Sequence, residues 1–348
     1  MSKPSPPQTL ILQGPCDAHV HLRDGVVLPH TVAYSALHYE HAIIMPNLEP
    51  PLCTTAQVLA YAKQVQTVSP AGFSPLFTLY GTSHTPPSEV EQVACSPEII
   101  GIKIYPHAVT TGSAQGVADL RTLEPLLEAA VHQQVPILLH AEDPDPTLTP
   151  AARERSFVAR HMAWLLGFEG LRLVIEHVST LEMVHAIRAA PQRVAATVTA
   201  HHLWHTNDPA HHPRNPHLHC APPLQTDQDR HALLVAAMTD DHFFLGTDSA
   251  PHSLLRKRQS SPPAGIFSAP VALPIYATLF ARHGHLGALE DFAVARARRF
   301  YGLPPGTKQV MLAPEPFCVP AAYPFGSTTV QPVAAGHTLP WRAMPVRS

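Results

Sequence analysis

The sequence predicts an α/β protein folded as a (β/α)8 TIM barrel, because eight short apolar, β-branched runs recur along the chain and helix-like segments separate most of them. Runs that are apolar throughout are typical of parallel strands buried on both faces. Eight strand–helix units are the number that closes such a sheet into a barrel. The alternative is a doubly wound open sheet, although the glycine-rich turn G-x-G-x-x-G that such sheets often carry is absent.

The predicted elements alternate along the chain. The strands are expected at 16–21, 42–46, 75–80, 99–104, 135–140, 172–177, 194–199 and 242–247. The intervening segments are rich in Ala, Leu, Glu, Gln or Arg at helical spacing, and they predict helices at 54–68, 121–133, 151–166, 180–190 and 227–240.

The two ends of the chain differ from this pattern. A short N-terminal segment precedes residue 16, and its three-residue apolar run is too short for a signal peptide. Nine of the 47 residues in 302–348 are Pro, without clear periodicity. We therefore expect one domain over 1–348, with a barrel core at about 16–305 and an irregular, Pro-rich C-terminal extension over 306–348. Residues 256–264 (RKRQSSPPA) predict an exposed loop.

Composition excludes several classes of function. The 348 residues hold 23 Lys and Arg against 26 Asp and Glu, a net charge of −3, so nothing favours nucleic acid or an anionic membrane as partner. No apolar stretch approaches the roughly 18 residues of a membrane span. The five Cys are scattered without a C-x-x-C pair, which argues against a disulfide framework and a thiolate zinc site. We expect a soluble, cytoplasmic protein.

Polar residues gather at or near the carboxyl ends of predicted strands, where barrel enzymes keep their catalytic groups. On a strand, residues two apart point to the same side, so a pair such as H-x-H can hold one metal ion. Imidazole and carboxylate ligands suit zinc, and a lone strand histidine would instead be ordinary core. The six residues concerned are His19, His21, Lys103, His140, His177 and Asp248.

Lys103 is unusual because it lies inside the apolar run GIKIY. Such a lysine can be a snorkelling or ion-paired side chain. A buried lysine also loses its proton readily, and the neutral amine can add carbon dioxide to form a carbamate. A carbamate is a carboxylate on a long arm and can bridge two cations.

The motifs around these residues resemble those of the amidohydrolase superfamily with a binuclear metal centre, and more closely the short, single-domain bacterial dihydroorotase family. The resemblance covers about residues 16 to 305. It is carried by the segments HVHLRDG, MPNLEPP, GIKIYP, PHLHCAP, FLGTDSAPH, FSAPVAL and RRFYGLP.

The resemblance implies a ligand set and a reaction. Two zinc ions per chain would be bound, the first by His19, His21 and Asp248 and the second by His140 and His177, with carbamylated Lys103 (N6-carboxylysine) and a hydroxide bridging them. The hydroxide would attack the ring amide of dihydroorotate, and Asp248 would move the proton to the leaving nitrogen. The product would be N-carbamoyl-aspartate, and the reaction, reversible, would belong to pyrimidine biosynthesis.

The resemblance also implies substrate contacts. Arg23 follows the histidine pair by two residues, so we expect it to face the same end of the barrel. Its guanidinium can bind a carboxylate through two parallel hydrogen bonds. The alternative is that Arg23 forms a surface salt bridge. The whole set comprises Arg23, Asn47 and His252 for the carboxylate, His21 and His140 beside the metals, Ala221 and Ala269 through backbone atoms, and Thr110 and Thr111 on a lid loop. Thr110 and Thr111 could equally be a polar turn.

Seven histidines fall within 201–219, at 201, 202, 205, 211, 212, 217 and 219. A third metal site and a solvated loop are the two interpretations. The sequence favours the loop, because three Pro interrupt the segment and no pair has a clear strand or helix context.

Two other functions remain open. One is another amidohydrolase acting on a cyclic ureide, which Arg23 and Asn47 disfavour because they point to an acidic substrate. The other is a non-catalytic, dihydroorotase-like subunit. The presence of a suitable residue at every metal-binding and proton-transfer position argues against this function. The resemblance further implies a homodimer.

Overall fold

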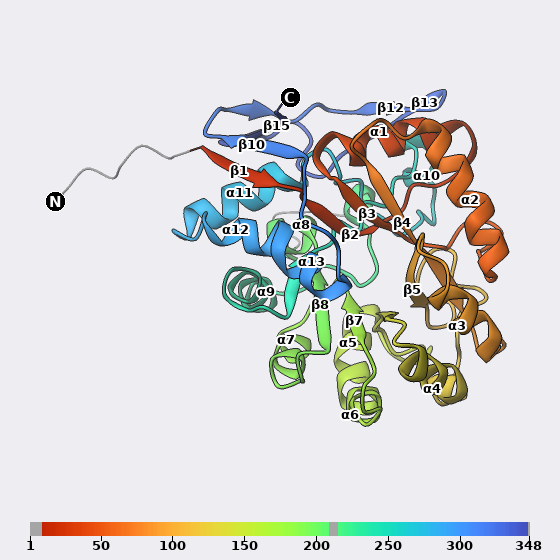
Figure 1. Ribbon diagram of the computed structural model, residues 1–348. Helices are drawn as coiled ribbons and strands as arrows, with labels where there is room; N and C mark the ends of the chain where they lie inside the picture. Colours follow the sequence, from red (N-terminus) through yellow and green to blue (C-terminus); the bar gives the residue numbers. More distant parts are fainter. Residues whose placement is uncertain (1–8, 209–214, 347–348) are drawn as a thin grey trace.

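The computed structural model describes residues 9–208 and 215–346, and its centre is a barrel of eight parallel strands in chain order (Figure 1). Each predicted strand is present, with ends that differ by up to two residues. The strands are β2 (Cys16–Val20), β3 (His41–Ile44), β4 (Ser74–Gly81), β5 (Ile99–Ile104), β6 (Ile137–His140), β7 (Leu173–Glu176), β8 (Val194–Val198) and β9 (Phe243–Leu245).

The barrel closes between its first and last strands just beyond the end of β9. The Asp248 N–H donates to the His19 carbonyl at 2.9 Å, and the His21 N–H donates to the Ser249 carbonyl at 3.1 Å. A parallel bridge joins Val20 to Ser249. The segments that carry three of the predicted site residues are therefore the seam of the barrel.

Helices cover the outside of the barrel, and all five predicted ones are present. Side-chain caps begin several of them: Thr54 and Gln57 form a capping box before α2, as Thr226 and Asp229 do before α9. The helices are α1 (Leu28–His38), α2 (Thr55–Val68), α3 (Pro87–Ala94), α4 (Glu124–Gln133), α5 (Pro150–Phe157), α6 (Ala163–Leu166), α7 (Leu181–Arg188), α8 (Ala200–Trp204), α9 (Asp227–Thr239), α10 (Leu254–Lys257), α11 (Ala272–Arg282), α12 (Ala288–Glu290) and α13 (Arg296–Tyr301). Single π-helical turns at Val158–Met162 and Asp291–Ala295 join α5 to α6 and α12 to α13.

The core has two layers because strand side chains alternate. On β6, Ile137 and Leu139 pack in the large cluster between strands and helices, whereas Leu138 belongs to a smaller one. That smaller cluster draws residues from six strands, which only the barrel interior can bring together; among them are Cys16, Ile43, Leu138, Val174, Ala195 and Phe244. Packed side chains thus fill the lower barrel and leave the carboxyl ends of the strands for polar groups.

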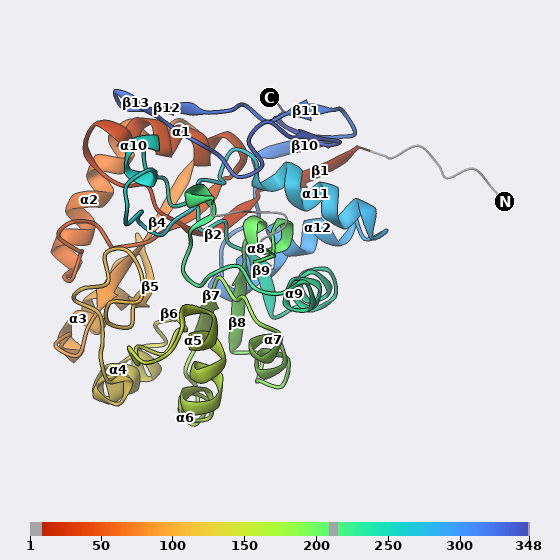
Figure 2. The same ribbon diagram turned by 180° about the vertical axis from the view of Figure 1, so that it is seen from behind.

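The C-terminal extension is more regular than predicted. It contributes β10 (Gln309–Ala313) and β15 (Arg342–Pro345) to an antiparallel sheet with β1 (Leu10–Gln13) from the N-terminal segment. Figure 2 shows this sheet lying across one side of the barrel, near α1 and α11. Two further pairs join β11 (Phe317–Cys318) to β14 (Thr338–Leu339) and β12 (Tyr323–Phe325) to β13 (Thr328–Val330). The prediction of an irregular extension was wrong because these short strands carry no local periodicity.

The segment 256–264 also departs from prediction. Lys257 ends α10 and is buried, with 3% of its surface exposed, although its neighbours Arg256 and Arg258 are exposed. The prediction of an exposed loop was therefore wrong for Lys257. Within the described residues, no helix is both long and apolar enough to cross a membrane.

Candidate metal centre and substrate pocket

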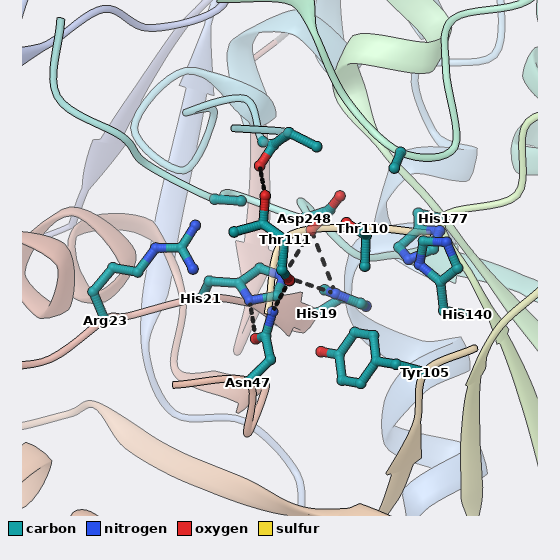
Figure 3. A pocket seen from close by; sticks show the side chains of 14 residues that line it. His19, His21, Arg23, Asn47, Tyr105, Thr110, Thr111, His140, His177 and Asp248 are labelled. Atoms are coloured by element: carbon teal, nitrogen blue, oxygen red, sulfur yellow. Dashed lines mark hydrogen bonds and ion pairs between the residues drawn. The ribbon is translucent and has the colours of Figure 1, made fainter. Parts of the chain in front are cut away.

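A pocket opens at the carboxyl ends of the barrel strands (Figure 3). Most predicted site residues line it: His19, His21, Arg23, Asn47, Thr110, Thr111, His140, His177, Ala221 and Asp248. Tyr105, Ala250, Ala264 and Gly265 line it as well, and the sequence had not singled them out. Lys103, His252 and Ala269 are absent from the lining. The topology thus brings residues from both ends of the chain to one cavity.

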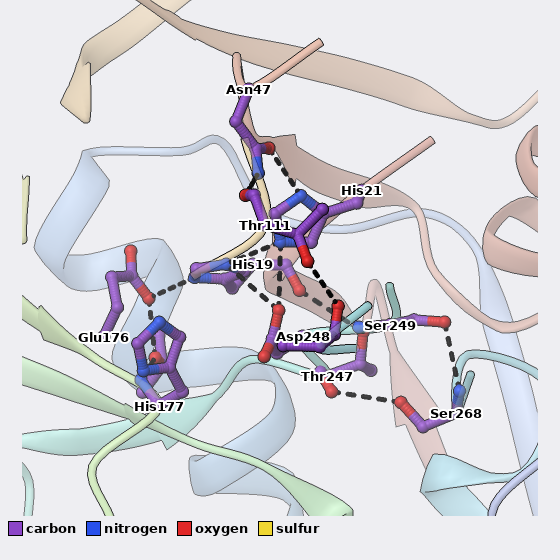
Figure 4. Close-up of polar contacts among 12 residues, drawn as sticks. His19, His21, Asn47, Thr111, Glu176, His177, Thr247, Asp248, Ser249 and Ser268 are labelled. Atoms are coloured by element: carbon purple, nitrogen blue, oxygen red, sulfur yellow. Dashed lines mark hydrogen bonds and ion pairs between the residues drawn. The ribbon is translucent and has the colours of Figure 1, made fainter. Parts of the chain in front are cut away.

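Three predicted ligands converge at the barrel seam (Figure 4). The Nε2 atoms of His19 and His21 are 3.3 Å apart. Asp248 Oδ1 lies 3.4 Å from the first and 3.0 Å from the second. All three side chains are at least 90% buried. The three atoms form a nearly equilateral triangle.

Hydrogen bonds on the far side of each ring assign the tautomers. His19 Nδ1 donates to Glu176 Oε2 at 2.7 Å. His21 Nδ1 donates to Asn47 Oδ1 at 2.7 Å, and the Asn47 amide nitrogen donates to the Thr111 carbonyl, which fixes which Asn47 atom is the oxygen. Both protons therefore sit on Nδ1 in the neutral rings, and both Nε2 lone pairs point toward Asp248.

This triangle fits a zinc ion. Zn–N bonds of about 2.0–2.1 Å that point to the corners of a tetrahedron place neighbouring ligand atoms about 3.3 Å apart. Two lone pairs and a carboxylate oxygen at this spacing repel one another unless a cation or a proton lies between them. A carboxylate or amide behind each metal-binding histidine is also the usual arrangement at zinc sites.

The second predicted pair lies beside the first. The ring centres of His140 and His177 are 4.6 Å apart, and that of His177 is 5.1 Å from that of His19. His140 Nε2 donates to Glu142 Oε2 at 2.6 Å, so its Nδ1 keeps the free lone pair. His177 Nδ1 is buried without a hydrogen-bond partner. The two histidines can hold a second cation, and neither has its available lone pair committed elsewhere.

Lys103 lies on β5 beneath these histidines and is fully buried. Its Nζ makes no hydrogen bond and sits 4.8 Å from the ring centre of Tyr105. Burial lowers the pKa of Lys103 to about 8, although the carboxylates of Glu176 and Asp248 favour the charged form. A buried ammonium without a hydrogen-bond partner is costly, and two added carbamate oxygens would give the group acceptors that can reach cations.

The backbone at the seam is shaped for these contacts. A Cβ on Gly246, the residue after β9, would lie 2.7 Å from Cβ of Thr197 on β8 and 3.0 Å from Cβ of His19 on β2, so only glycine fits between these two strands. Asp248 has a positive φ of 43°, which turns its carboxylate inward. Burial raises the pKa of Asp248, but its contact with His21, the nearby His19 and the positive charge of Lys103 outweigh burial and hold the pKa below its ordinary value.

Arg23 and His252 form a second polar group beside the predicted metal ligands. Arg23 Nε donates to the Pro251 carbonyl at 3.2 Å, and Arg23 Nη2 lies 3.1 Å from His252 Nε2. His252 Nε2 is also 3.0 Å from the Ala264 carbonyl, which can only accept. Burial and then the charge of Arg23 lower the pKa of His252 to about 2, so the ring is neutral and its proton is on Nε2. An N–H of Arg23 therefore faces an N–H of His252.

The residues predicted to form a lid lie next to His252 at the Ala264 carbonyl. Thr111 Oγ1 donates to the Ala264 carbonyl at 3.1 Å, and Thr110 lines the pocket beside it. Ala221 also lines the pocket. Ala269 lies behind, where its N–H donates to Ser249 Oγ at 3.0 Å, so this backbone group is already satisfied within the protein.

In the first part of the His-rich segment, His201, His202 and His205 are buried, so this part is not the solvated loop that the sequence favoured, whereas His219 is exposed. His201 and His202 lie on α8 and are buried, and together with Cys220 they could hold a metal ion by proximity. However, His202 Nε2 donates to the Pro222 carbonyl and its Nδ1 accepts from Thr199 Oγ1, so its only lone pair is in use. The hydrogen bonding therefore favours a structural role over a third metal site. His211 and His212 lie outside the described residues.

The sequence analysis missed the carboxylates behind the histidines. Glu142 follows His140 by two residues, and Glu176 precedes His177. Strand alternation would point only one of Glu176 and His177 into the barrel. His177 has a positive φ of 42°, which returns its ring to the same side as Glu176. The signal available in the sequence was an acidic residue close to each of His140 and His177.

The chain is similar to known dihydroorotases in sequence and in structure. No protein-family model matches the chain. The dihydroorotase of Nitrosococcus oceani is 42% identical over 339 residues, which cover 96% of this chain and 98% of that protein. A solved dihydroorotase from Campylobacter jejuni has a TM-score of 0.87 and 32% identity, covering 96% of this chain and 97% of its own. The Saccharomyces cerevisiae dihydroorotase, solved in complex with 5-fluoroorotic acid, has a TM-score of 0.92 and 28% identity, covering 98% and 100%.

Proposed function

The chain belongs to the dihydroorotase family, and from that premise we propose that its barrel pocket interconverts dihydroorotate and N-carbamoyl-aspartate. The protein is accordingly a cyclic amide hydrolase of pyrimidine biosynthesis. The observation that carries the assignment of the site is the convergence of His19, His21 and Asp248 on one point, with their lone pairs facing inward.

We propose that the pocket holds two zinc ions per chain. His19, His21 and Asp248 would hold the first, His140 and His177 the second, and Lys103, carbamylated, would reach both. When bound, the ions supply activation of water and polarisation of the amide carbonyl. The buried, unpartnered Nζ of Lys103 and the free lone pairs of the histidines support this ligand set.

We propose that Arg23 and His252 bind the substrate carboxylate. Their N–H groups converge, and within the described residues the Arg23 guanidinium contacts no carboxylate. A bound carboxylate would accept from Arg23 and share the His252 Nε2 proton with the Ala264 carbonyl, and it would relieve the N–H to N–H contact between Arg23 and His252. Asn47 contributes differently, since its amide orients His21 and bonds the lid at Thr111.

Asp248 is proposed as the group that moves the proton. Its depressed pKa keeps it ionised, so it is ready to accept a proton from the attacking water. It would then deliver the proton to the ring nitrogen as the amide bond breaks. The inward turn of its backbone places the carboxylate at the pocket rather than in the strand.

The direct test is a substrate panel with the purified, zinc-loaded protein. Dihydroorotate should be consumed, whereas the neutral rings dihydrouracil and hydantoin should react far more slowly because they lack the carboxylate. Equal turnover of the neutral rings would favour another cyclic-ureide hydrolase. A metal-loaded protein without turnover of any ring would favour a non-catalytic subunit.

We further propose that 1–348 is a single domain that forms homodimers and works in the cytoplasm. Pairing of β1 with β10 ties the N-terminal segment to the extension, which supports one domain. All five cysteines are unpaired, the usual state in a reducing compartment. Light scattering of the purified protein tests the dimer.

A further inference from the structure

Lys257 is a buried cation next to the pocket that the proposed reaction does not use. Its Nζ donates to the carbonyls of His219 at 3.1 Å, Pro263 at 3.0 Å and Gly265 at 2.8 Å. Within the described residues its ammonium has no carboxylate partner. Lysine is almost never this buried without a paired acid, because desolvating the charge costs free energy.

The three carbonyls belong to two separate walls of the pocket. His219 lies two residues before Ala221, which lines the pocket. Pro263 and Gly265 flank Ala264, and Ala264 and Gly265 line it from the other side. The Gly265 N–H also donates to the His219 carbonyl at 3.0 Å, so the two walls meet at Lys257. One side chain thus ties together segments that lie more than 40 residues apart.

Ala264 lies between two of the residues whose carbonyls Lys257 binds. Two side chains that are predicted to contact the substrate donate hydrogen bonds to the Ala264 carbonyl. The Ala264 carbonyl accepts from Thr111 Oγ1 at 3.1 Å and from His252 Nε2 at 3.0 Å. Because Lys257 Nζ donates to the carbonyls of Pro263 and Gly265, the Ala264 carbonyl between them is held pointing toward Thr111. Gly265 has a φ of 137°, and a Cβ there would lie 2.6 Å from the Ala250 carbonyl oxygen, so the segment has no room to shift inward.

We propose that Lys257 is a positioning residue that sets substrate affinity by holding the Ala264 carbonyl as the docking point of the Thr111 lid and of His252. The inference rests on the proposed function, since it assigns the way in which that same pocket closes on its substrate. It requires no contact between Lys257 and the substrate or the metal ions.

The test compares Lys257→Met with Arg258→Met, which removes a cation from the exposed neighbouring position. Loss of a charge-assisted clamp should raise KM for dihydroorotate and for carbamoyl-aspartate about tenfold, while kcat changes by less than about threefold. Metal content should stay that of the wild type. Arg258→Met should keep the wild-type KM. An unchanged KM in Lys257→Met, or a fall in kcat alone, would overturn the proposal.

A double-mutant cycle with Thr111→Val separates positioning from general destabilisation. If Lys257 acts through the Ala264 carbonyl, Lys257→Met should raise KM much less once the Thr111 hydroxyl is gone. Fully multiplicative effects would contradict the proposal. If Lys257→Met does not fold, the same cycle with Lys257→Gln, which keeps amide donors, decides the question by the same criterion. An inactive wild-type protein would speak against the proposed function, whereas an active wild type with independent effects would speak against Lys257 alone.

Discussion

Nε2 of His19 lies 3.3 Å from Nε2 of His21, and the Nδ1 proton of each ring is already donated to another residue, Glu176 and Asn47 respectively. The two lone pairs therefore face each other across a gap that suits a shared cation. This relationship links the sequence motif H-x-H to its chemistry, because the residues behind the rings decide which nitrogen is free.

Lys103→Ala should remove most of the bound zinc and the activity, since the proposed carbamate is the group that reaches both ions. The wild type should hold about two zinc ions per chain in elemental analysis. Short carboxylic acids added with zinc should restore part of the turnover by standing in for the carbamate. A fully active protein with one ion or fewer would contradict the binuclear site.

Glu176→Gln should weaken zinc binding roughly 10- to 100-fold, because the partner of His19 Nδ1 loses its charge and the histidine becomes a poorer ligand. Competition with a zinc chelator measures the change. Glu290→Gln, at an exposed position on α12, is the matched control and should bind zinc as the wild type does. Equal zinc affinity in both variants would show that the Glu176 charge does not tune the site.

The sequence predicted the strands and most of the polar residues that line the pocket, because both depend on local patterns: apolar runs, and polar residues at their ends. It failed where a residue's role depends on distant partners. Lys257 reads as part of a charged loop, yet it is buried because three carbonyls from two segments surround it. β1 and β10 pair across nearly 300 residues, which no periodicity reveals. His177 and Glu176 share one side only because of a positive φ.

Arg23→Met should raise KM for dihydroorotate and carbamoyl-aspartate by a factor that corresponds to roughly 1.5–3 kcal/mol, the usual contribution of a hydrogen bond to a charged group. Zinc content should not change, because the hydrogen-bond partners of the Arg23 side chain among the described residues are Pro251 and His252 and not the predicted metal ligands. Arg23→Lys keeps the charge without the bidentate geometry, so its KM should lie between those of the wild type and Arg23→Met. Wild-type kinetics in Arg23→Met would place the carboxylate elsewhere.

Glu154 should make stability depend on pH. It is buried beneath Ser179, whose N–H and hydroxyl donate to it, and burial raises the pKa of Glu154 to about 7 from an ordinary value of 4.5. A raised carboxyl pKa gives stability that is fully present below about pH 4.5 and is lost as the pH rises through 7. The melting temperature of the wild type minus that of Glu154→Gln should therefore decrease as the pH rises from about 4.5 to about 7. At higher pH this difference should stay constant. A difference that does not vary with pH would contradict this assignment.

The most direct test of the central claim is to measure turnover of dihydroorotate and zinc content side by side for the wild type and Asp248→Asn. The substitution keeps the shape of the side chain but removes its capacity to accept the proton. We expect an active wild type and a variant whose turnover is lower by roughly 10²–10⁴-fold. That loss should persist in samples that hold both zinc ions. Near-normal turnover of Asp248→Asn with both ions bound would show that another group moves the proton.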